Sequence, residues 1–191
     1  AKAVTKKTRL IFICNPNNPT GTIVYQKAVA HFLSQLPEWV SVVFDEAYGE
    51  YVTDPNYPVS SQILKKGHPI IFLRTFSKIY GLAGLRIGYG VGHPDLIDLL
   101  NRVRLPFNAN TLAQRAAVAA LSDTDHVKAT LKQNEQGKRY LYKAFDDMGM
   151  DYIPTEANFI YFSVSDPKKG VQKGWGRDLM AKGVYEALLR Q

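Results

Sequence analysis

The residue whose setting most favours chemistry in this sequence is a lysine. Lys78 follows the apolar run PIIFL (69–73), has the hydroxyl residues Thr75 and Ser77 just before it, and is followed eight residues later by Arg86. A lysine amine can form a Schiff base with an aldehyde. At the end of a strand, however, a lysine is usually a solvated surface charge. A chemical role for Lys78 therefore requires partners elsewhere in the chain.

Polar residues also follow two earlier apolar runs. Asn18 comes after RLIFICNP (9–16), while Asp45 and Tyr48 close the run VSVVFDEAY (40–48). Taken singly, Asn18 could be a turn residue, Asp45 a helix cap and Tyr48 part of the edge of the core. In open α/β sheets, however, ligands bind outside the carboxyl ends of the strands. We therefore expect the three strand ends to bring these residues to one crevice.

The combined set of residue types matches the needs of pyridoxal phosphate chemistry. Lys78 would form the Schiff base with the cofactor aldehyde, and the Asp45 carboxylate would favour the protonated pyridine nitrogen. Asn18 and Tyr48 would hydrogen-bond the phenolate oxygen of the cofactor ring. An arginine and nearby hydroxyls suit a phosphate, because the guanidinium fork donates two charge-assisted hydrogen bonds. The expected phosphate ligands are Thr75, Ser77 and Arg86.

The elements that must position these residues alternate between apolar strands and helices. Val29, Phe32, Leu33 and Leu36 have the spacing of an amphipathic helix, which Pro37 ends. Apolar runs without polar alternation, separated by helices, predict an α/β fold in which a mostly parallel sheet carries helices on both faces. The predicted strands lie at 9–16, 40–48, 68–78 and 85–92.

The pattern changes after Pro106. Thr111 followed by Gln114 predicts a capping box that opens a helix. A second helix is expected from Asp123 to Met148, with Gly149 as its stop. The last predicted elements are a strand at 158–164, a Gly- and Lys-rich loop at 165–176 and a helix at 176–190. The chain begins in a strand and ends on a helix, which suggests a fragment of something longer.

Composition narrows the class of protein. The 191 residues are 46% hydrophobic and 21% charged, as in ordinary globular proteins, and contain no apolar run that could span a bilayer and no secretory signal. The net charge of +7 is spread along the chain, so we expect no nucleic-acid partner. The four histidines lack metal-ligand spacing, so no metal is expected. Cys14 is the only cysteine, which excludes an internal disulfide and favours a cytoplasmic location.

Three motifs give the chain a resemblance to a known family. They are NPNNPTG (15–21), DEAYGEY (45–51) and TFSKIYGLAGLRIGYG (75–90). In this order and at these separations, they resemble the pyridoxal-phosphate-dependent class I/II aminotransferases of fold type I. Within that family, RLPFNANTLAQRAA (104–117) and TEANFIYF (155–162) look most like histidinol-phosphate aminotransferases.

The resemblance implies a transaminase that moves an amino group between L-histidinol phosphate and 2-oxoglutarate in histidine biosynthesis. Lys78 would be its Schiff-base lysine and proton shuttle, and the substrates would be a small-molecule amino donor and a 2-oxo acid acceptor. A homodimer is also implied. The implied division is part of the large cofactor-binding domain (1–108), connecting helices (109–149) and part of a small C-terminal domain (150–191). The family's N-terminal portion and its late C-terminal arginine have no match here.

Other hypotheses about the activity are also compatible with the sequence. Aromatic amino-acid aminotransferases share much of the same sequence texture. A decarboxylase or lyase could use the same cofactor residues, since those residues do not choose which Cα bond breaks. A truncated, inactive fragment would retain the motifs as well. A nucleotide-binding loop at GYGVG (88–92) is disfavoured, because the run lacks the full G-x-G-x-x-G spacing and a following acidic residue.

Overall fold

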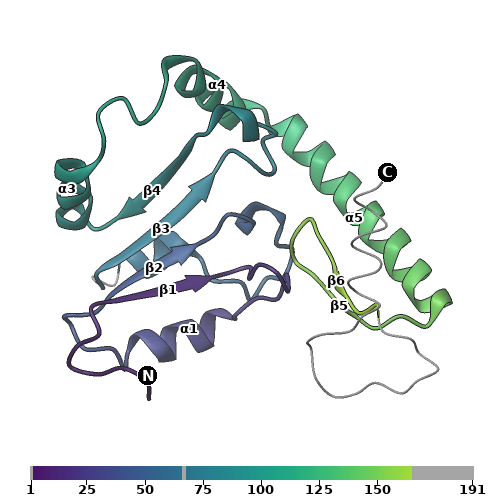
Figure 1. Cartoon of the computed structure of the whole chain (residues 1–191), viewed down its shortest axis with the longest axis horizontal. Coiled ribbons are helices and arrows are strands. Elements are labelled where there is room, and N and C mark those ends of the chain that lie inside the picture. The colour runs from purple at the N-terminus through teal and green to yellow at the C-terminus, as the bar shows by residue number, and fades with distance from the viewer. Residues whose placement is uncertain (1, 66–67, 165–191) are drawn as a thin grey trace.

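The computed structural model describes residues 2–65 and 68–164, and its centre is a four-stranded sheet in the order β1–β2–β3–β4 (Figure 1). Strands β1 (Leu10–Cys14), β2 (Ser41–Asp45) and β3 (Ile70–Thr75) are parallel, whereas β4 (Gly88–Gly92) runs antiparallel to β3. All four predicted strands are therefore present. The mostly parallel α/β fold is confirmed, with β4 as its antiparallel member.

The register of the sheet separates two faces of different character. Helices α1 (Gln26–Leu33) and α2 (Ser60–Leu64) cover the face on which Val42, Phe44, Ile70 and Phe72 lie. The rings of Phe44 and Phe72 stack across neighbouring strands at 5.0 Å, and burying each such side chain contributes about 1.5–3 kcal/mol. On the opposite face Phe12 is 69% exposed, so the described residues cover this face less fully.

Within the described residues, three further helices follow β4. They are α3 (Pro94–Val103), α4 (Thr111–Ser122) and α5 (Thr124–Met148). Helix α3 was not predicted. Helix α5 agrees with its prediction: the Asp123 side chain accepts the N–H of His126, and Gly149 ends the helix in the left-handed conformation at φ 65°. The carboxyl ends of β1, β2 and β3 point toward α5 (Figure 1).

The predicted capping box at the start of α4 is wrong by one residue. The cap is Asn110, whose side chain accepts the N–H of Ala113 at 2.8 Å. Gln114 instead donates to the carbonyl oxygen of Ala109 at 2.9 Å. Asn110 is extended and Thr111 is already helical, so only the asparagine oxygen can reach the free N–H groups of the first turn.

The last described strands form a small antiparallel pair, β5 (Tyr152–Ile153) with β6 (Tyr161–Phe162). The predicted strand at 158–164 is thus shorter than expected. The residues before β6 pack against Tyr48 rather than joining a sheet. The predicted loop at 165–176 and helix at 176–190 lie outside the described residues. Among the helices that are described, none is long and apolar enough to cross a membrane.

Candidate active site

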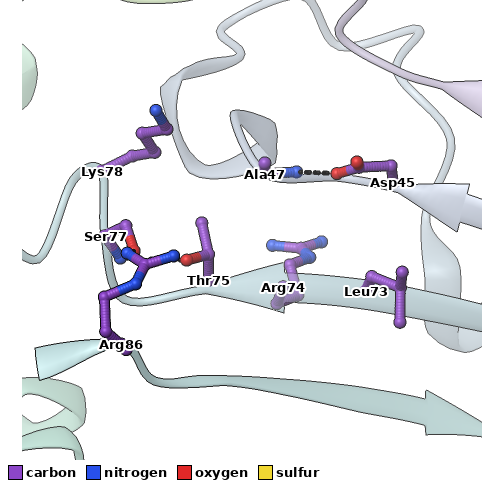
Figure 2. A pocket seen from close by; sticks show the side chains of 8 residues that line it. All are labelled: Asp45, Ala47, Leu73, Arg74, Thr75, Ser77, Lys78 and Arg86. Carbon is purple, nitrogen blue, oxygen red and sulfur yellow. Dashed lines mark hydrogen bonds between the residues drawn. The ribbon is translucent and has the colours of Figure 1, made fainter. Parts of the chain in front are cut away.

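The carboxyl ends of β2 and β3 form the wall of a pocket of about 310 Å³. Asp45 ends β2 opposite Leu73, and Thr75 ends β3 two residues further along, on the same face of the sheet. Side chains alternate between the faces of a strand, so this spacing directs Asp45 and Thr75 to the same side. The lining residues are Asp45, Ala47, Leu73, Arg74, Thr75, Ser77, Lys78 and Arg86 (Figure 2).

One side of the pocket carries an arginine and two hydroxyls. The Ser77 N–H donates to Thr75 Oγ1 at 3.0 Å, which closes a tight turn after β3. The Arg86 Nη1 atom lies 3.5 Å from Ser77 Oγ and donates to the Ala83 carbonyl oxygen at 2.8 Å. Figure 2 shows the guanidinium beside Ser77 and Thr75. These groups gather hydrogen-bond donors on one side of the pocket, as an anionic group such as a phosphate requires.

Arg86 reaches this position through an unusual backbone conformation. Its φ is 54°, in the left-handed region, where a residue with a side chain is strained by about 1–3 kcal/mol. The strand that follows runs very close to β3: a Cβ atom on Gly88 would lie 2.7 Å from the Arg74 carbonyl oxygen. Glycine is therefore required at 88, and the close approach brings Arg86 back beside Ser77. Strain concentrated here is consistent with a binding role.

Lys78 lies beside a pair formed by Asn18 and Tyr48. Its exposed side chain points away from Arg86 (Figure 2), and its Nζ atom lies over the Tyr48 ring, 5.1 Å from the ring centroid. The Tyr48 hydroxyl accepts a hydrogen bond from Asn18 Nδ2 at 3.3 Å. Asn18 comes from the 15–22 loop, which closes on itself through the Asn17 N–H donating to the Thr22 carbonyl oxygen. Asn18 and Tyr48 are thus next to Lys78, although they do not line the pocket.

The Asp45 carboxylate occupies the pocket wall away from Arg86 (Figure 2). Its Oδ1 atom accepts the N–H of Ala47 at 3.1 Å, which orients the carboxylate at the strand end. Cys14 ends β1 directly opposite Asp45. Burial raises the pKa of the Cys14 thiol, and the negative charge of Asp45 raises it further. The Asp45 charge therefore acts on its neighbours at this edge of the sheet.

Arg74, which also lines the pocket, belongs to a charge cluster on the helix-covered side that the sequence reasoning missed. Arg74 Nε and Nη2 lie 2.7 and 2.6 Å from Glu46 Oε2, and Arg74 Nη1 donates to Glu50 at 2.9 Å. Glu46 is 1% exposed and also accepts the Ser60 hydroxyl. Burial raises the pKa of Glu46 against the opposing effect of Arg74. Burial lowers the pKa of Arg74, but the two glutamates outweigh it and raise that pKa.

The sequence contained a signal for this cluster. Glu46 directly follows Asp45, and Arg74 directly precedes Thr75. In a strand, consecutive residues face opposite sides, so a residue next to a pocket residue lies on the other face. Two opposite charges at matched positions of adjacent strands, both on the covered face, are expected to pair, because a buried charge without a partner is very costly.

Five of the seven predicted site residues therefore line one pocket, and the other two lie beside Lys78. A carboxylate on one side and a cluster of donors on the other can hold a ligand with a cationic nitrogen at one end and an anion at the other. The Lys78 side chain lines the same pocket. The volume is within the roughly 300–1,000 Å³ usual for small-molecule sites, so the residues fit pyridoxal phosphate. Residues 2–65 and 68–164 contain no cluster of side chains placed to bind a metal.

Comparison with known proteins defines the class. The family model described as aminotransferase class I and II matches residues 1–191, and the chain belongs to that family. The chain is 55% identical over 185 residues to histidinol-phosphate aminotransferase of Moorella thermoacetica, with 96% of this chain and 47% of the relative covered. It is 52% identical over 189 residues to histidinol-phosphate aminotransferase 1 of Nitrosococcus oceani, covering 99% and 48%. The chain spans about half the length of the curated relatives it matches.

Solved structures agree with this assignment. The histidinol-phosphate aminotransferase of Sinorhizobium meliloti, in complex with pyridoxal 5′-phosphate, superposes with a TM-score of 0.77 at 31% identity, covering 84% of this chain and 44% of that one. The enzyme of the same name from Clostridium acetobutylicum gives a TM-score of 0.81 at 22% identity, with 95% and 52% covered, which speaks to the fold. The family and fold predicted from the three motifs are confirmed.

Proposed function

We propose that this chain builds the cofactor site of a pyridoxal-phosphate-dependent transaminase that exchanges an amino group between L-histidinol phosphate and 2-oxoglutarate in histidine biosynthesis. The observation that carries the proposal is the pocket itself, in which Asp45, Lys78 and Arg86 come together from separate segments of the chain. The names and the 44–55% identity of the first five relatives support the choice of substrate.

When bound, pyridoxal phosphate supplies an aldehyde that takes up the amino group and a ring that accepts the electron pair released at the substrate Cα. The chain's residues would hold and tune this group. Arg86, Ser77 and Thr75 would bind the phosphate, since they already lie together on one side of the pocket. Asp45 would accept a hydrogen bond from the protonated ring nitrogen, because a nearby carboxylate stabilises the cationic form of the ring.

Asn18 and Tyr48 would hydrogen-bond the ring oxygen that lies next to the aldehyde. Their mutual hydrogen bond fixes the Tyr48 hydroxyl, and the Lys78 amine lies over the ring of the same tyrosine. A donor at this oxygen favours its anionic form and so lowers the proton affinity of the neighbouring nitrogen.

Lys78 would have two tasks. Its amine would hold the cofactor through the aldehyde until a substrate amine replaces it. The freed amine would then serve as the acid–base group that moves the substrate Cα proton. A lysine is suited to this work when a neighbouring cationic group keeps it neutral.

We further propose the three-part division into 1–108, 109–149 and 150–191, with the first part belonging to a large cofactor-binding domain and the last to a small domain. By family resemblance we infer that the enzyme acts as a homodimer in the cytoplasm. Size-exclusion chromatography with light scattering tests the oligomer, and fractionation of cells tests the location.

Reductive trapping tests the proposed function. The protein is mixed with pyridoxal phosphate, reduced with borohydride and digested, and the pyridoxyl group is mapped by mass spectrometry. We expect the label on Lys78, with Lys78→Ala as the unlabelled control and Lys27, an exposed helix residue, as an internal comparison. Label spread over surface lysines, in both this chain and a polypeptide of the full length of the relatives, would sink the proposal.

Product analysis then separates the reactions open to the cofactor. Transfer from histidinol phosphate to 2-oxoglutarate, measured as glutamate formed, is expected to exceed transfer from phenylalanine. The reverse order would indicate an aromatic amino-acid aminotransferase. Release of carbon dioxide without glutamate would indicate a decarboxylase.

A further inference from the structure

Residues 155–159 are far in sequence from the three motifs at 15–21, 45–51 and 75–90. In the structure they contact both the loop that carries Asn18 and the ring of Tyr48. We call this stretch the 155–159 segment. It connects β5 to β6, and Figure 1 shows this part of the chain beside the carboxyl ends of β1 and β2. Thr155 is buried and Ala157 is 0% exposed, so these two residues anchor the segment in the protein, whereas Asn158 between Ala157 and Phe159 is exposed.

The segment packs first against the loop that carries Asn18. The Glu156 N–H donates to the Gly21 carbonyl oxygen at 2.9 Å. Gly21 has φ +71°, and a Cβ atom there would lie 1.8 Å from Thr155 Oγ1, so the loop and the segment are in direct contact. Glu156 Oε2 also accepts the N–H of Thr53, at 2.9 Å. The loop is therefore fixed from outside as well as by its own hydrogen bonds.

The segment packs second against the tyrosines that follow β2. The Phe159 ring meets the Tyr48 ring edge-to-face, with centroids 5.1 Å apart and an interplanar angle of 82°. Ala157 and Phe159 belong to the same apolar cluster as Tyr48. Edge-to-face aromatic pairs are attractive and directional, so Phe159 restricts the plane of the Tyr48 ring.

The segment is itself held from behind by α5. Asn134 Nδ2 donates to the Ala157 carbonyl oxygen at 3.2 Å, and Lys138 Nζ donates to that of Thr155 at 3.2 Å. The Tyr142 hydroxyl accepts the Thr155 N–H at 2.8 Å. Lys138 is buried and forms an ion pair with Glu135 one helical turn away. Three successive turns of one helix thus grip the segment, which makes it a rigid support.

We propose that Phe159 is a positioning residue for Tyr48, and that the 155–159 segment sets the geometry of the Asn18–Tyr48 pair from α5. The inference rests on the proposed function, because it gives the Tyr48 hydroxyl a cofactor to meet. The Tyr48 ring is restrained by Lys78 over its ring, Asn18 at its hydroxyl and Phe159 at its side. Of these, Phe159 alone neither carries a polar group nor lines the pocket, so it would act on the cofactor through Tyr48.

The expected consequence is electrostatic. A well-placed Tyr48 hydroxyl donates to the anionic ring oxygen and lowers the proton affinity of the nitrogen that Lys78 contributes. A tilted Tyr48 ring weakens that hydrogen bond, so the proton is held to higher pH. Since full loss of a hydrogen bond to a charged group corresponds to roughly 1–2 pH units, we expect Phe159→Leu to raise the midpoint by about 0.5–1 unit.

The test is a pH titration of the bound cofactor's absorbance in the full-length holoenzyme. The proteins compared are wild type, Phe159→Leu, Tyr48→Phe and the double variant. As a single variant, Phe159→Leu should raise the midpoint of the titration. In the Tyr48→Phe background, the same substitution should cause no further change. Phe162→Leu is the matched control, because Phe162 lies in the same β5–β6 hairpin but stacks on Phe145 of α5, at 4.8 Å. This substitution is expected to leave the midpoint unchanged.

An unchanged midpoint in Phe159→Leu, a shift that adds fully to that of Tyr48→Phe, or an equal shift in Phe162→Leu would each overturn the inference. Should Phe159→Leu fail to fold, Phe159→Met is titrated in its place. A wild-type protein with no absorbance from cofactor bound at Lys78 would mean instead that the proposed function is wrong.

Discussion

At the ends of β2 and β3, the two faces of the sheet differ in how their charged and polar side chains are engaged. On one face these side chains are buried and paired, and on the other they are open to a ligand. The Asp45 and Thr75 side chains lie on the pocket face of the sheet. Those of Glu46 and Arg74, their neighbours in sequence, lie on the helix-covered face, where Ser60 of α2 bonds Glu46, although Arg74 also lines the pocket. Glu46 is 1% exposed and is engaged by Arg74 and Ser60. On the pocket side, Lys78 is exposed and lies near an aromatic ring.

This difference separates structural charges from chemical ones. Where Glu46, Arg74 and Glu50 meet, each charge has a partner in the folded chain, so the group stabilises the strand ends and has little left to offer a ligand. The pocket groups lie where a ligand can reach them. Adjacent residues at a strand end therefore have different roles. Those on one face of the sheet stabilise the fold, and those on the other face are available to a ligand.

The largest expected effect comes from Lys78→Ala on the pocket face. Loss of the amine should lower the rate of amino transfer by at least about 10²–10⁴-fold, the usual contribution of a positioned acid–base group. The free energy of unfolding should change by less than about 0.5 kcal/mol, since Lys78 is exposed. Steady-state kinetics and urea denaturation measure the two. A large loss of stability would mean that the two faces do not divide as described.

Arg74→Met, on the covered face, should have its main effect on stability, with a secondary effect on rate because Arg74 also lines the pocket. Removing the guanidinium leaves the Glu46 carboxylate buried without its cation, which costs about 3–5 kcal/mol. Urea denaturation measures the loss. The double variant Arg74→Met with Glu46→Gln should recover part of that stability, because no unpaired charge then remains. If the double variant is as unstable as the sum of the single ones, the pair is not coupled.

The adjacent carboxylates Asp45 and Glu46 offer a matched pair of substitutions. Asp45→Asn should lower amino transfer by about 10²–10³-fold, because an electrostatic partner of the cofactor ring is lost, with little effect on stability. Glu46→Gln should cost about 1–3 kcal/mol of stability through its buried partners and have the smaller effect on rate. Equal effects of the two substitutions on both quantities would remove the distinction between the faces.

The smallest expected effect concerns Cys14, which lies opposite Asp45 on the pocket face. Burial and the Asp45 charge raise its pKa, so less thiolate is present at neutral pH than for a free thiol of pKa about 8.5. The rate of alkylation by iodoacetamide should therefore rise with a midpoint above that value. Asp45→Asn should lower the midpoint by removing the negative charge. An unaltered midpoint would show that the carboxylate does not act on its neighbour.

Much of this arrangement could be predicted from the sequence. The apolar runs that end at Asp45 and at Thr75 indicated strands, and parallel strands bring their carboxyl ends to one edge. Helix α5 could be predicted because its apolar stripe, Asp123 and Gly149 all agree. Local chemistry was sufficient for these elements.

Other features depend on contacts that a linear pattern does not contain. The pairing of Glu46 with Arg74 requires the register of two strands, and the contact of Phe159 with Tyr48 joins residues more than a hundred positions apart. Strand β5 has two residues, too few for any periodicity. Helix α3 was missed although Pro94 and the spacing of Leu96, Leu99 and Leu100 are a helix signal, so in that case the information was present.

The contact between Gly21 and Thr155 also determines when, during synthesis of the chain, the site can be completed. Glu156 hydrogen-bonds both Gly21 and Thr53, the latter across 103 residues of chain. A ribosome that adds about 5–20 residues per second needs on the order of ten seconds to make that intervening stretch. Until then the Asn18 loop lacks its outer support. The nascent chain would therefore expose Lys78 well before it can hold a reactive aldehyde in a defined geometry, and cofactor loading is expected to be a late event in the life of the newly made protein.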